Sequence, residues 1–515
     1  MPQAGRRHSE ISTSSYTARQ RSLFQEETIT SVLSNGFPFS SKLAAHTSCV
    51  NTLAFSSGQG RFLASGGDDF RIYLWDFHQE DVTVPIYNLC GPKVSYSRRS
   101  DWVLSAGTDE TVLKYNISTV GLQLDSGTGT KPPDRTFRLH DDTIRAISCH
   151  SYQEEVFMSA GQDGRILLHD GRDSGLFRAQ STLQLPTEAT GVRYHPTMEH
   201  IFATCDSHGG VCLRDTRMAF GPLLSRTREG VIQKKYLTKL TRKTHSALCE
   251  PESSSLTFNS DGSKLAVVML VNFLPTIYGL SDPIPLAVCS GKNHPDGTPV
   301  LPPERTYSNS CTIKNGAFGS FGLVNDEFYC AGSEDFRGYM WKVPSVDQLV
   351  NQRIEVSAED WASKSWPNVT AFTCARGAPR YIPVDLSTPH CYLHGHKSIV
   401  NSVLCHPHLF HVMTCGIEDD IILHSPTPTS PCAPNLQHTS TDVRVLEEGS
   451  HQDWAMYLRA LVAERSESEM TPIRMFDHIL REEGNIDVFD QRQRASEDSS
   501  TDEMESMDEG DGDND

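Results

Sequence analysis

Two parts of the chain hold a histidine, a serine and an aspartate, the three residue types of a hydrolase triad. In a triad the histidine takes the proton of the serine, which attacks a carbonyl carbon, and the aspartate orients the histidine. The two sets, each with 23 residues from histidine to aspartate, are His46, Ser65 and Asp69, and His140, Ser159 and Asp163. Because a catalytic site has no reason to be repeated within one chain, the repetition indicates a structural role, and we expect no enzyme activity.

Cysteine and histidine are concentrated between positions 391 and 415, where four such side chains could surround a zinc ion. The candidate ligands are Cys391, His394, His396, Cys405, His406, His408, His411 and Cys415. No compact four-ligand spacing emerges from them, and His396 and Cys415 already occupy positions of the repeat described below. No glycine-rich phosphate loop lies between a strand and a helix. The sequence therefore predicts neither a metal site nor a cofactor.

A third pattern is an aspartate followed two residues later by an arginine. Two successive copies of the repeat described below end in this pattern, as Asp170-Gly171-Arg172 and as Asp215-Thr216-Arg217. A guanidinium group is planar and permanently charged, so it offers a partner's carboxylate or carbonyl groups a fork of donors that lysine lacks. The alternative is that each arginine caps a neighbouring carbonyl of its own chain. Occurrence at two successive places favours a binding role.

These patterns lie among short alternating apolar runs separated by turn residues, which is typical of β-strands. Residues 138–172 hold three such runs. A three-stranded meander has two unpaired edges and one uncovered apolar face, so it requires copies of itself. Six copies keep a six-residue step to the end of the third strand: Asp69 to Trp75, Asp109 to Tyr115, Asp163 to His169, His208 to Arg214, Asp335 to Trp341 and Glu418 to His424. A seventh copy near 253–280 lacks the turn aspartate.

The copies resemble the WD-repeat family, in which a Gly-His pair precedes a Trp-Asp pair by some thirty residues; Gly395-His396 and Trp75-Asp76 are the matching pairs. The resemblance implies an all-β fold, a seven-bladed WD-repeat β-propeller with one four-stranded blade per copy. In this family the histidine, serine, aspartate and tryptophan hydrogen-bond across a blade. Ser41 to Ala45 would form the outermost strand of the last blade and close the ring, which protects its strand edges.

Outside the repeats, the sequence predicts a mobile leader over residues 1–39, the propeller over 40–426, and a third region over 427–515 with a Pro- and Ser-rich linker. An amphipathic helix from Leu23 to Leu33 and a leader without structure are both compatible with the first region. Further expected elements are a helical stripe at Ile232, Tyr236, Leu237 and Leu240, short amphipathic helices near 454–462 and 475–480, and a disordered tail from Glu497 to Asp515 with ten acidic and no basic residues.

The composition restricts the classes of partner and location. The net charge of −19 argues against general binding of nucleic-acid phosphates. Fourteen cysteines without a CxxC spacing are typical of a reduced, intracellular protein. The first residues lack the apolar region of a secretory signal, and the longest apolar run, Leu265 to Val271, is too short to span a bilayer. We expect the cytoplasm, the nucleus or both, with no membrane and no direct nucleic-acid partner.

A narrower resemblance follows from the two Asp-x-Arg endings, which are similar to the Trp-Asp-x-Arg boxes of cullin-associated WD-repeat factors. The later copies, FNSDGSKLAVVML, AGSEDFRGYMWKVP and GHKSIVNSVLCHP, resemble the factor-5 branch, and the match covers roughly 43–426. His169 and Arg214 stand where the boxes have tryptophan. Whether the docking on an adaptor protein that the boxes imply survives this loss of tryptophan is left open by the sequence.

This resemblance implies a non-enzymatic substrate receptor of a cullin-4 RING ubiquitin ligase, docked on the damaged-DNA-binding-protein adaptor and holding an unidentified protein substrate. The implied adaptor-binding residues are Asp170, Arg172, Asp215 and Arg217. The alternative is a general WD-repeat scaffold of a chromatin or RNA-processing complex without a ligase link.

Overall fold

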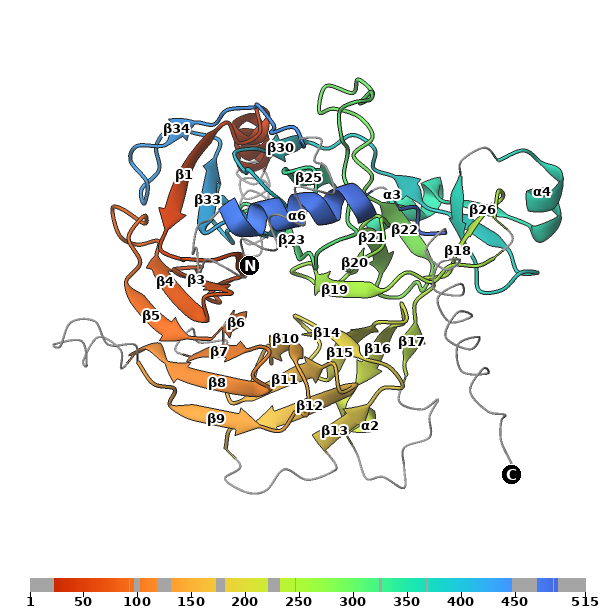
Figure 1. The fold of residues 1–515 in the computed structure, drawn as a ribbon. Coiled ribbons are helices and arrows are strands. Elements are labelled where there is room, and N and C mark those ends of the chain that lie inside the picture. The colour runs from red at the N-terminus through yellow and green to blue at the C-terminus, as the bar shows by residue number, and fades with distance from the viewer. Residues whose placement is uncertain are drawn as a thin grey trace, which may run out of the picture.

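The computed structural model describes residues 23–91, 93–96, 102–118, 131–172, 181–220, 232–245, 247–323, 327–366, 369–446, 470–484 and 486–489. Within these ranges the chain forms eight sheets, nearly all of them antiparallel, and few helices (Figure 1). Seven sheets are arranged as the blades of a ring, because their innermost strands contact one another in sequence order and the last contacts the first. The all-β propeller class expected from the sequence is confirmed.

The first four blades each take four consecutive strands. The first blade consists of β2 (Val50–Phe55), β3 (Phe62–Gly67), β4 (Arg71–Asp76) and β5 (Tyr87–Cys90), and the second of β6 (Lys93–Tyr96), β7 (Trp102–Ala106), β8 (Thr111–Asn116) and β9 (Arg135–Arg138). The third blade consists of β10 (Ile144–Cys149), β11 (Val156–Gly161), β12 (Arg165–Asp170) and β13 (Thr182–Gln184), and the fourth of β14 (Ala189–Tyr194), β15 (Ile201–Asp206), β16 (Val211–Asp215) and β17 (Lys234–Lys235).

The last three blades recruit strands from distant parts of the chain. The fifth blade consists of β19 (Ser253–Phe258), β20 (Lys264–Met269), β21 (Thr276–Gly279), β22 (Pro285–Val288) and β29 (Val384–Asp385). The sixth consists of β23 (Gly316–Gly319), β24 (Phe328–Gly332), β25 (Gly338–Lys342) and β30 (Cys391–Leu393). The seventh consists of β31 (Val400–Cys405), β32 (Val412–Gly416), β33 (Asp420–Ser425), β1 (Phe39–Ala44) and β34 (Gln437–His438).

The hydrophobic core lies between neighbouring blades. Alternate residues of a strand point to opposite faces of its sheet, so each blade offers an apolar face to the next. Ile72 and Leu74 of the first blade, for example, belong to one buried cluster with Val103 and Tyr115 of the second. Packing of this kind around the ring covers both faces of the blades and fixes the positions of their strand ends.

Strand β1 closes the ring by pairing with β33, in a register that runs from Phe39 opposite Ser425 to Ala44 opposite Asp420. Lys42 adds an ion pair with Asp420, with Nζ and Oδ2 2.6 Å apart. The prediction that this segment closes the ring is therefore confirmed, one or two residues from the expected bounds. It is not the outermost strand of the last blade as predicted, because β34 pairs with its outer edge. Beyond residue 426, β34 pairs with β1, and Cys432 and Leu436 pack into the same core.

The eighth sheet lies outside the ring (Figure 1). It consists of β18 (Leu240–Arg242), β27 (Thr370–Phe372), β28 (Arg380–Ile382) and β26 (Ile354–Val356), with α4 (Ala358–Ser363) beside it and α3 (Val346–Gln352) preceding it. The predicted helical stripe over residues 232–240 is wrong, because Lys234–Lys235 form the outer strand of the fourth blade and Leu240 pairs with Phe372.

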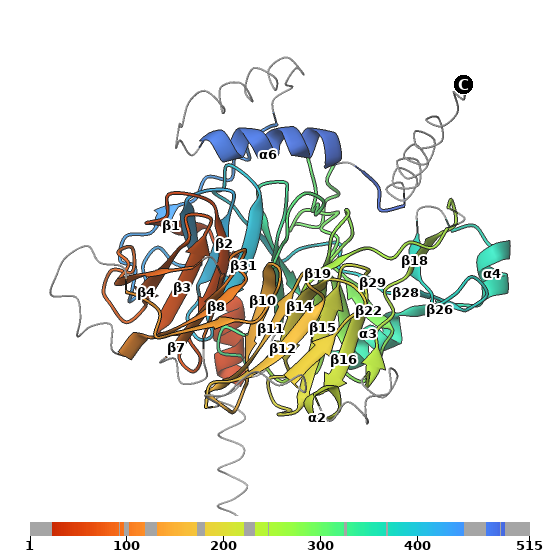
Figure 2. The same cartoon turned by 60° about the horizontal axis from the view of Figure 1, so that its bottom comes forward.

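Helices lie on both faces of the ring (Figure 2). Residues 23–33 form the helix that the sequence left open, and it buries Ile29 and Leu33 against the sixth and seventh blades. Helix α2 (Thr216–Ala219) lies on one face, here called the α2 face, and α6 (Met470–Glu483) crosses the opposite face, here called the α6 face.

Among the described helices, none is long and apolar enough to cross a membrane. The expected helix near 454–462 and the acidic tail 497–515 lie outside the described residues.

Candidate functional site

The first histidine, serine and aspartate set is a buried hydrogen-bond network inside one blade. His46 precedes β2 and donates from Nδ1 to Asp69, whose carboxylate oxygens lie 3.0 and 3.1 Å away. The Ser65 hydroxyl lies 2.9 Å from Nε2 of His46 and accepts the indole N–H of Trp75 at 3.0 Å. Ser65 is fully buried between these rings, so no substrate can reach it.

The same network recurs with different residues. His140 contacts Asp163 and Ser159, and Ser159 lies 2.7 Å from Nε2 of His169. In the seventh blade the corresponding residues are His396, Glu418, Thr414 and His424. Three copies of one arrangement confirm that its role is structural.

The replacement of tryptophan in the two boxes keeps a donor in place. His169 stands ten residues after Ser159, as Trp75 does after Ser65, and its ring nitrogen approaches the same hydroxyl. In the fourth blade Arg214 donates from Nε to Thr204 Oγ1, again ten residues earlier, at 3.0 Å. The departures at 169 and 214 therefore preserve the cross-strand bond and leave the strand ends where a tryptophan would hold them.

Replacing Asp163 by alanine is expected to lower the free energy of unfolding by about 1–3 kcal/mol, because it strands buried donors. Asp163 accepts hydrogen bonds from His140 and from the backbone N–H groups of Asp141 and Arg165. Urea unfolding measures the change. The matched control is Asp141→Ala, since that carboxylate is 71% exposed and its loss should cost under about 0.5 kcal/mol. Equal stability of the two variants would contradict the assignment.

Stability is also expected to fall with pH below 6.5. Burial lowers the pKa of His169 to about 3, with the ring stacked on Phe157 at 4.2 Å. The unfolded chain binds a proton at this histidine below pH 6.5 and the folded chain does not, so acidification favours unfolding. From pH 7 to pH 5 this group alone should remove about 2 kcal/mol. In His169→Gln the free energy of unfolding, measured with urea, should fall by about 2 kcal/mol less between pH 7 and pH 5 than in the unaltered chain. An identical fall in the two proteins would refute the assignment.

The histidines and cysteines between 391 and 415 are distributed over separate contacts. His396 belongs to the blade network, His406 lies 3.1 Å from the carbonyl oxygen of Gly60, and His411 lies 3.0 Å from Ser430. Cys405 faces Cys330 with the sulfur atoms 3.5 Å apart. Within the described part of the chain, no three His, Cys, Asp or Glu side chains are grouped so as to hold a metal ion.

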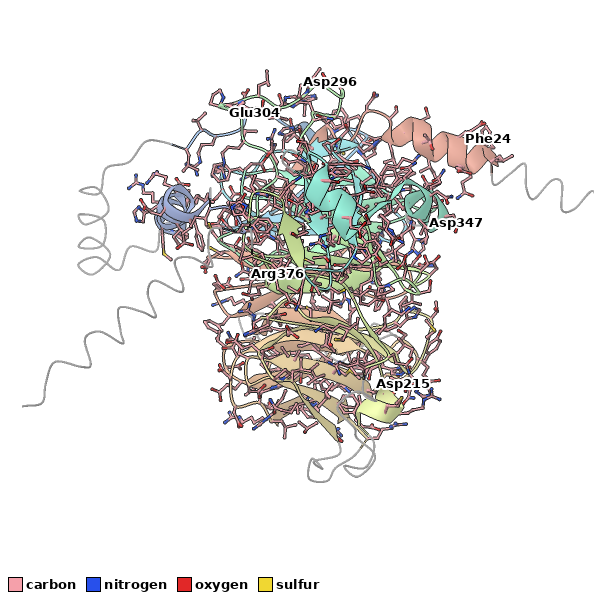
Figure 3. All side chains as sticks on the ribbon, turned by 90° about the vertical axis from the view of Figure 1, so that its right-hand side faces the viewer. Phe24, Asp215, Asp296, Glu304, Asp347 and Arg376 are labelled. Carbon is pink, nitrogen blue, oxygen red and sulfur yellow. The ribbon has the colours of Figure 1, made fainter. Side chains whose placement is uncertain are left out.

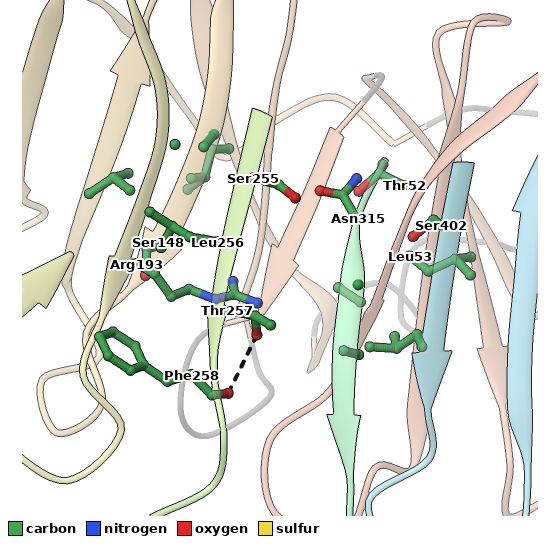
Figure 4. A pocket seen from close by; sticks show the side chains of 18 of the residues that line it. Thr52, Leu53, Ser148, Arg193, Ser255, Leu256, Thr257, Phe258, Asn315 and Ser402 are labelled. Carbon is green, nitrogen blue, oxygen red and sulfur yellow. Dashed lines mark hydrogen bonds between the residues drawn. The ribbon is translucent and has the colours of Figure 1, made fainter. Parts of the chain in front are cut away.

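The central channel of the ring contains a cavity of ≈ 480 Å³ (Figure 4). Its walls are the innermost strands, and Arg145 and Arg193 are the charged residues among those that line it. Several hydroxyl groups of the lining are engaged with backbone: Ser255 donates to the carbonyl of Lys314, and Thr257 donates to that of Phe258. The Ser255 bond joins the fifth blade to the segment before β23, whereas the Thr257 bond stays within β19; in both the acceptor is a backbone carbonyl and not a base.

The two Asp-x-Arg endings share one geometry. At the end of β12, Arg172 donates from Nε and Nη2 to the two carboxylate oxygens of Asp170 at 2.9 and 2.6 Å. After β16, Arg217 does the same to Asp215 at 3.0 and 2.6 Å. Each aspartate also accepts the backbone N–H of its arginine. These hydrogen bonds hold the pKa of both aspartates below the usual value, so both pairs are ionised at neutral pH.

Both guanidinium groups are exposed and held in a fixed orientation. The side chain of Arg172 is 64% exposed and that of Arg217 is 68% exposed. The carboxylates use Nε and Nη2, which leaves the Nη1 edge for another acceptor. The alternative that each arginine caps a backbone carbonyl is not seen in the described chain, where the bonded acceptors are side-chain oxygens.

The two arginines lie on the same face of the ring. Strands β12 and β16 are the third strands of adjacent blades, so they run in the same direction and end on the same side. That side is the α2 face, because Asp215 caps α2 (Figure 2). Figure 3 shows Asp215 and the helix bearing Phe24 on the side away from α6. The geometry therefore brings the four predicted site residues onto one surface.

A third pair of the same kind was missed by the sequence pattern. Asp76 ends β4 of the first blade and binds Arg61 through Nε and Nη2 at 3.0 and 2.8 Å. The arginine precedes β3 and stands 15 positions before the aspartate, so no Asp-x-Arg spacing reveals it; the strand pairing of Phe62 with Asp76 brings it there. Its side chain is half exposed. The α2 face thus carries an oriented guanidinium at three blades.

Comparisons with known proteins identify sequences that are similar to this chain. The family described as WD domain, G-beta repeat matches residues 37–76. DDB1- and CUL4-associated factor 5 of Mus musculus and of Homo sapiens are each 25% identical over 402 residues, 76% of this chain. Histone acetyltransferase type B subunit 2 of Kluyveromyces lactis is 25% identical over 126 residues, 24% of this chain and 28% of that protein.

The length of the match limits which properties of these relatives can be applied to this chain. The similarity covers 34% of each factor-5 protein, so the chain spans about a third of the length of these relatives. Within the chain it extends well beyond the single repeat matched by the family description and is much longer than the similarity to the acetyltransferase subunit.

Proposed function

We propose that this chain is a substrate receptor of a cullin-4 RING ubiquitin ligase, because it contains a match to the WD-repeat family and is similar to DDB1- and CUL4-associated factor 5. It would dock on the damaged-DNA-binding-protein adaptor through the α2 face. The observation that supports this most is the pair of exposed guanidinium groups, Arg172 and Arg217, held alike on adjacent blades. Asp170 and Asp215 take part as the groups that orient them.

The proposed mechanism is proximity. The chain would bind the adaptor on one surface and a protein substrate on another, which would raise the concentration of substrate lysines near the ligase. An oriented guanidinium suits this task, because its remaining donors can bind a carboxylate or carbonyl group of the adaptor without first losing side-chain freedom. This function requires the cytoplasm or the nucleus, where the reduced cysteines are stable.

The test is affinity purification of the tagged full chain from cells, with quantitative mass spectrometry. We expect the adaptor and cullin-4 to co-purify, the adaptor in a ratio near one to one with the tagged chain. Recovery of neither protein would overturn the ligase assignment.

A second candidate function is a general scaffold, which the similarity to a histone acetyltransferase subunit favours. The same purification separates the two functions. A stable set of chromatin or RNA-processing proteins, without the adaptor, would support the scaffold.

A further inference from the structure

The chain covers part of its own α6 face with residues 470–484 and 486–489, here called the strap. Figure 1 shows α6 lying across the opening of the ring, and Figure 2 shows that it lies outside the blades. The strap begins at residue 470, whereas the preceding described segment ends at residue 446.

An ion pair and an apolar contact hold the helix of the strap against the ring. Asp477 accepts both terminal nitrogens of Arg444 at 2.6 and 2.7 Å, and its side chain is 8% exposed. Leu480 is buried in a cluster formed with Cys49, Phe336, Ile399 and Ile417, which come from loops and turns of the first, sixth and seventh blades. The opposite side of the helix, including Met475 and Glu482, is exposed.

The end of the strap packs between the fifth blade and the eighth sheet. Asp487 pairs with Arg242 at 2.6 Å, and the Phe489 ring lies under the Arg242 guanidinium and stacked on His245 at 5.0 Å. Val488 is buried and its carbonyl oxygen accepts the thiol of Cys249 at 3.1 Å. Arg242 thus contacts both the acidic and the aromatic residue, and Cys249 binds the backbone of the valine between them.

The ring side of the contact contains an unusual backbone. Val271 and Asn272, in the turn between β20 and β21, both have positive φ, at 67° and 52°. A β-branched residue is an outlier in this region, and such strain is concentrated at binding sites. The conformation aims the Asn272 side chain at the strap, where Nδ2 donates to the carbonyls of Gly484 and Ile486 at 3.0 and 2.7 Å.

We propose that the α6 face is a binding site for an amphipathic helix followed by an acidic-aliphatic-aromatic turn, and that the strap occupies this site in competition with a partner protein. The partner would carry the same chemistry: an acidic residue for Arg444, an apolar residue in the place of Leu480, and an Asp-Val-Phe-like end. The mode is that of a helix laid on an apolar groove. The proposal does not depend on adaptor docking, since Arg172 and Arg217 lie on the opposite face.

The test uses the full chain and a fluorescent peptide with the sequence of residues 470–489. A tethered segment competes at an effective concentration of about 1 mM, so the unaltered chain should bind the peptide weakly. In the released variant, Asp487→Ala with Phe489→Ala, the peptide should bind about 10–100-fold more tightly. The matched control is Met475→Ala with Glu482→Ala, on the exposed side of α6, which should bind like the unaltered chain.

A ring-side variant separates binding from folding. Glycine adopts positive φ without strain, so Asn272→Gly removes the amide group and keeps the turn. Added to the released variant, it should weaken peptide binding about tenfold at an unchanged melting temperature. Equal peptide affinity of the released and unaltered chains, no binding to the released chain, or no effect of Asn272→Gly would each overturn the proposal.

If the released variant does not fold, the unaltered chain still gives a result. Excess peptide should speed hydrogen exchange of the strap amides, and unchanged exchange would refute the competition.

Discussion

Replacing both Arg172 and Arg217 by alanine is expected to abolish co-purification of the adaptor while the ring stays folded. Truncating one partner of a desolvated charged hydrogen bond typically costs about 2–5 kcal/mol of binding energy, or more than tenfold in affinity for each site. The folded state should lose little, because the Arg172 and Arg217 pairs are exposed and such pairs contribute about 0–1 kcal/mol. Co-purification and the melting temperature are measured on the same preparation.

Two further variants sharpen this result. Arg165→Ala removes an arginine from the start of the same strand, β12, on the α6 face, and should leave the adaptor bound. Arg217→Lys should weaken binding, because an ammonium group cannot keep the two-pronged bond to Asp215 while offering another donor edge. A folded double variant that retains the adaptor would show that these arginines are not the docking site.

Replacing Lys314 by methionine is expected to lower the free energy of unfolding by about 3–5 kcal/mol, the largest single-site loss that the structure predicts. Lys314 Nζ lies 2.8 Å from Glu334 Oε1, and both side chains are fully buried. The Glu334 carboxylate also accepts the backbone N–H groups of Ser310 and Cys311. Without the lysine, an uncompensated negative charge remains in the interior of the sixth blade.

Urea unfolding measures this loss, and a second substitution tests its cause. In Lys314→Met with Glu334→Gln both charges are absent, so at least half of the lost stability should return. The matched control is Lys342→Met, whose ion pair with Glu327 is exposed and which should change stability by less than about 1 kcal/mol. If the double variant is no more stable than Lys314→Met, the stranded charge is not the cause.

The blades could be predicted from the sequence because the same pattern of apolar runs and turn residues recurs several times along the chain. The six-residue step from turn to strand end places Trp75 and His169 correctly, and the networks around Ser65 and Ser159 follow from it. The Asp-x-Arg residues were found because both members of each pair stand two positions apart on one strand end.

The features that escaped prediction depend on long-range pairing. Arg61 reaches Asp76 only because β3 pairs with β4, and Lys314 reaches Glu334 across 20 positions without a repeating pattern. The helical stripe ending at Leu240 failed for a related reason. Its partner, Phe372, is more than a hundred residues away, and the pairing of the two strands outweighs the local periodicity.

The pairing of β1 with β33 also sets an order of events during synthesis. Strand β1 leaves the ribosome early, but its partner residues 420–425 follow almost four hundred residues later. At roughly 5–20 residues per second, the β1 edge waits some tens of seconds before it can be paired. The first six blades can thus collapse while the ring is still open, and the seventh is completed only when β1 pairs with β33 and closes the ring. During this interval the unpaired edges of β1 and the newest blade are templates for other nascent chains, so chaperones are expected to associate with the incomplete ring.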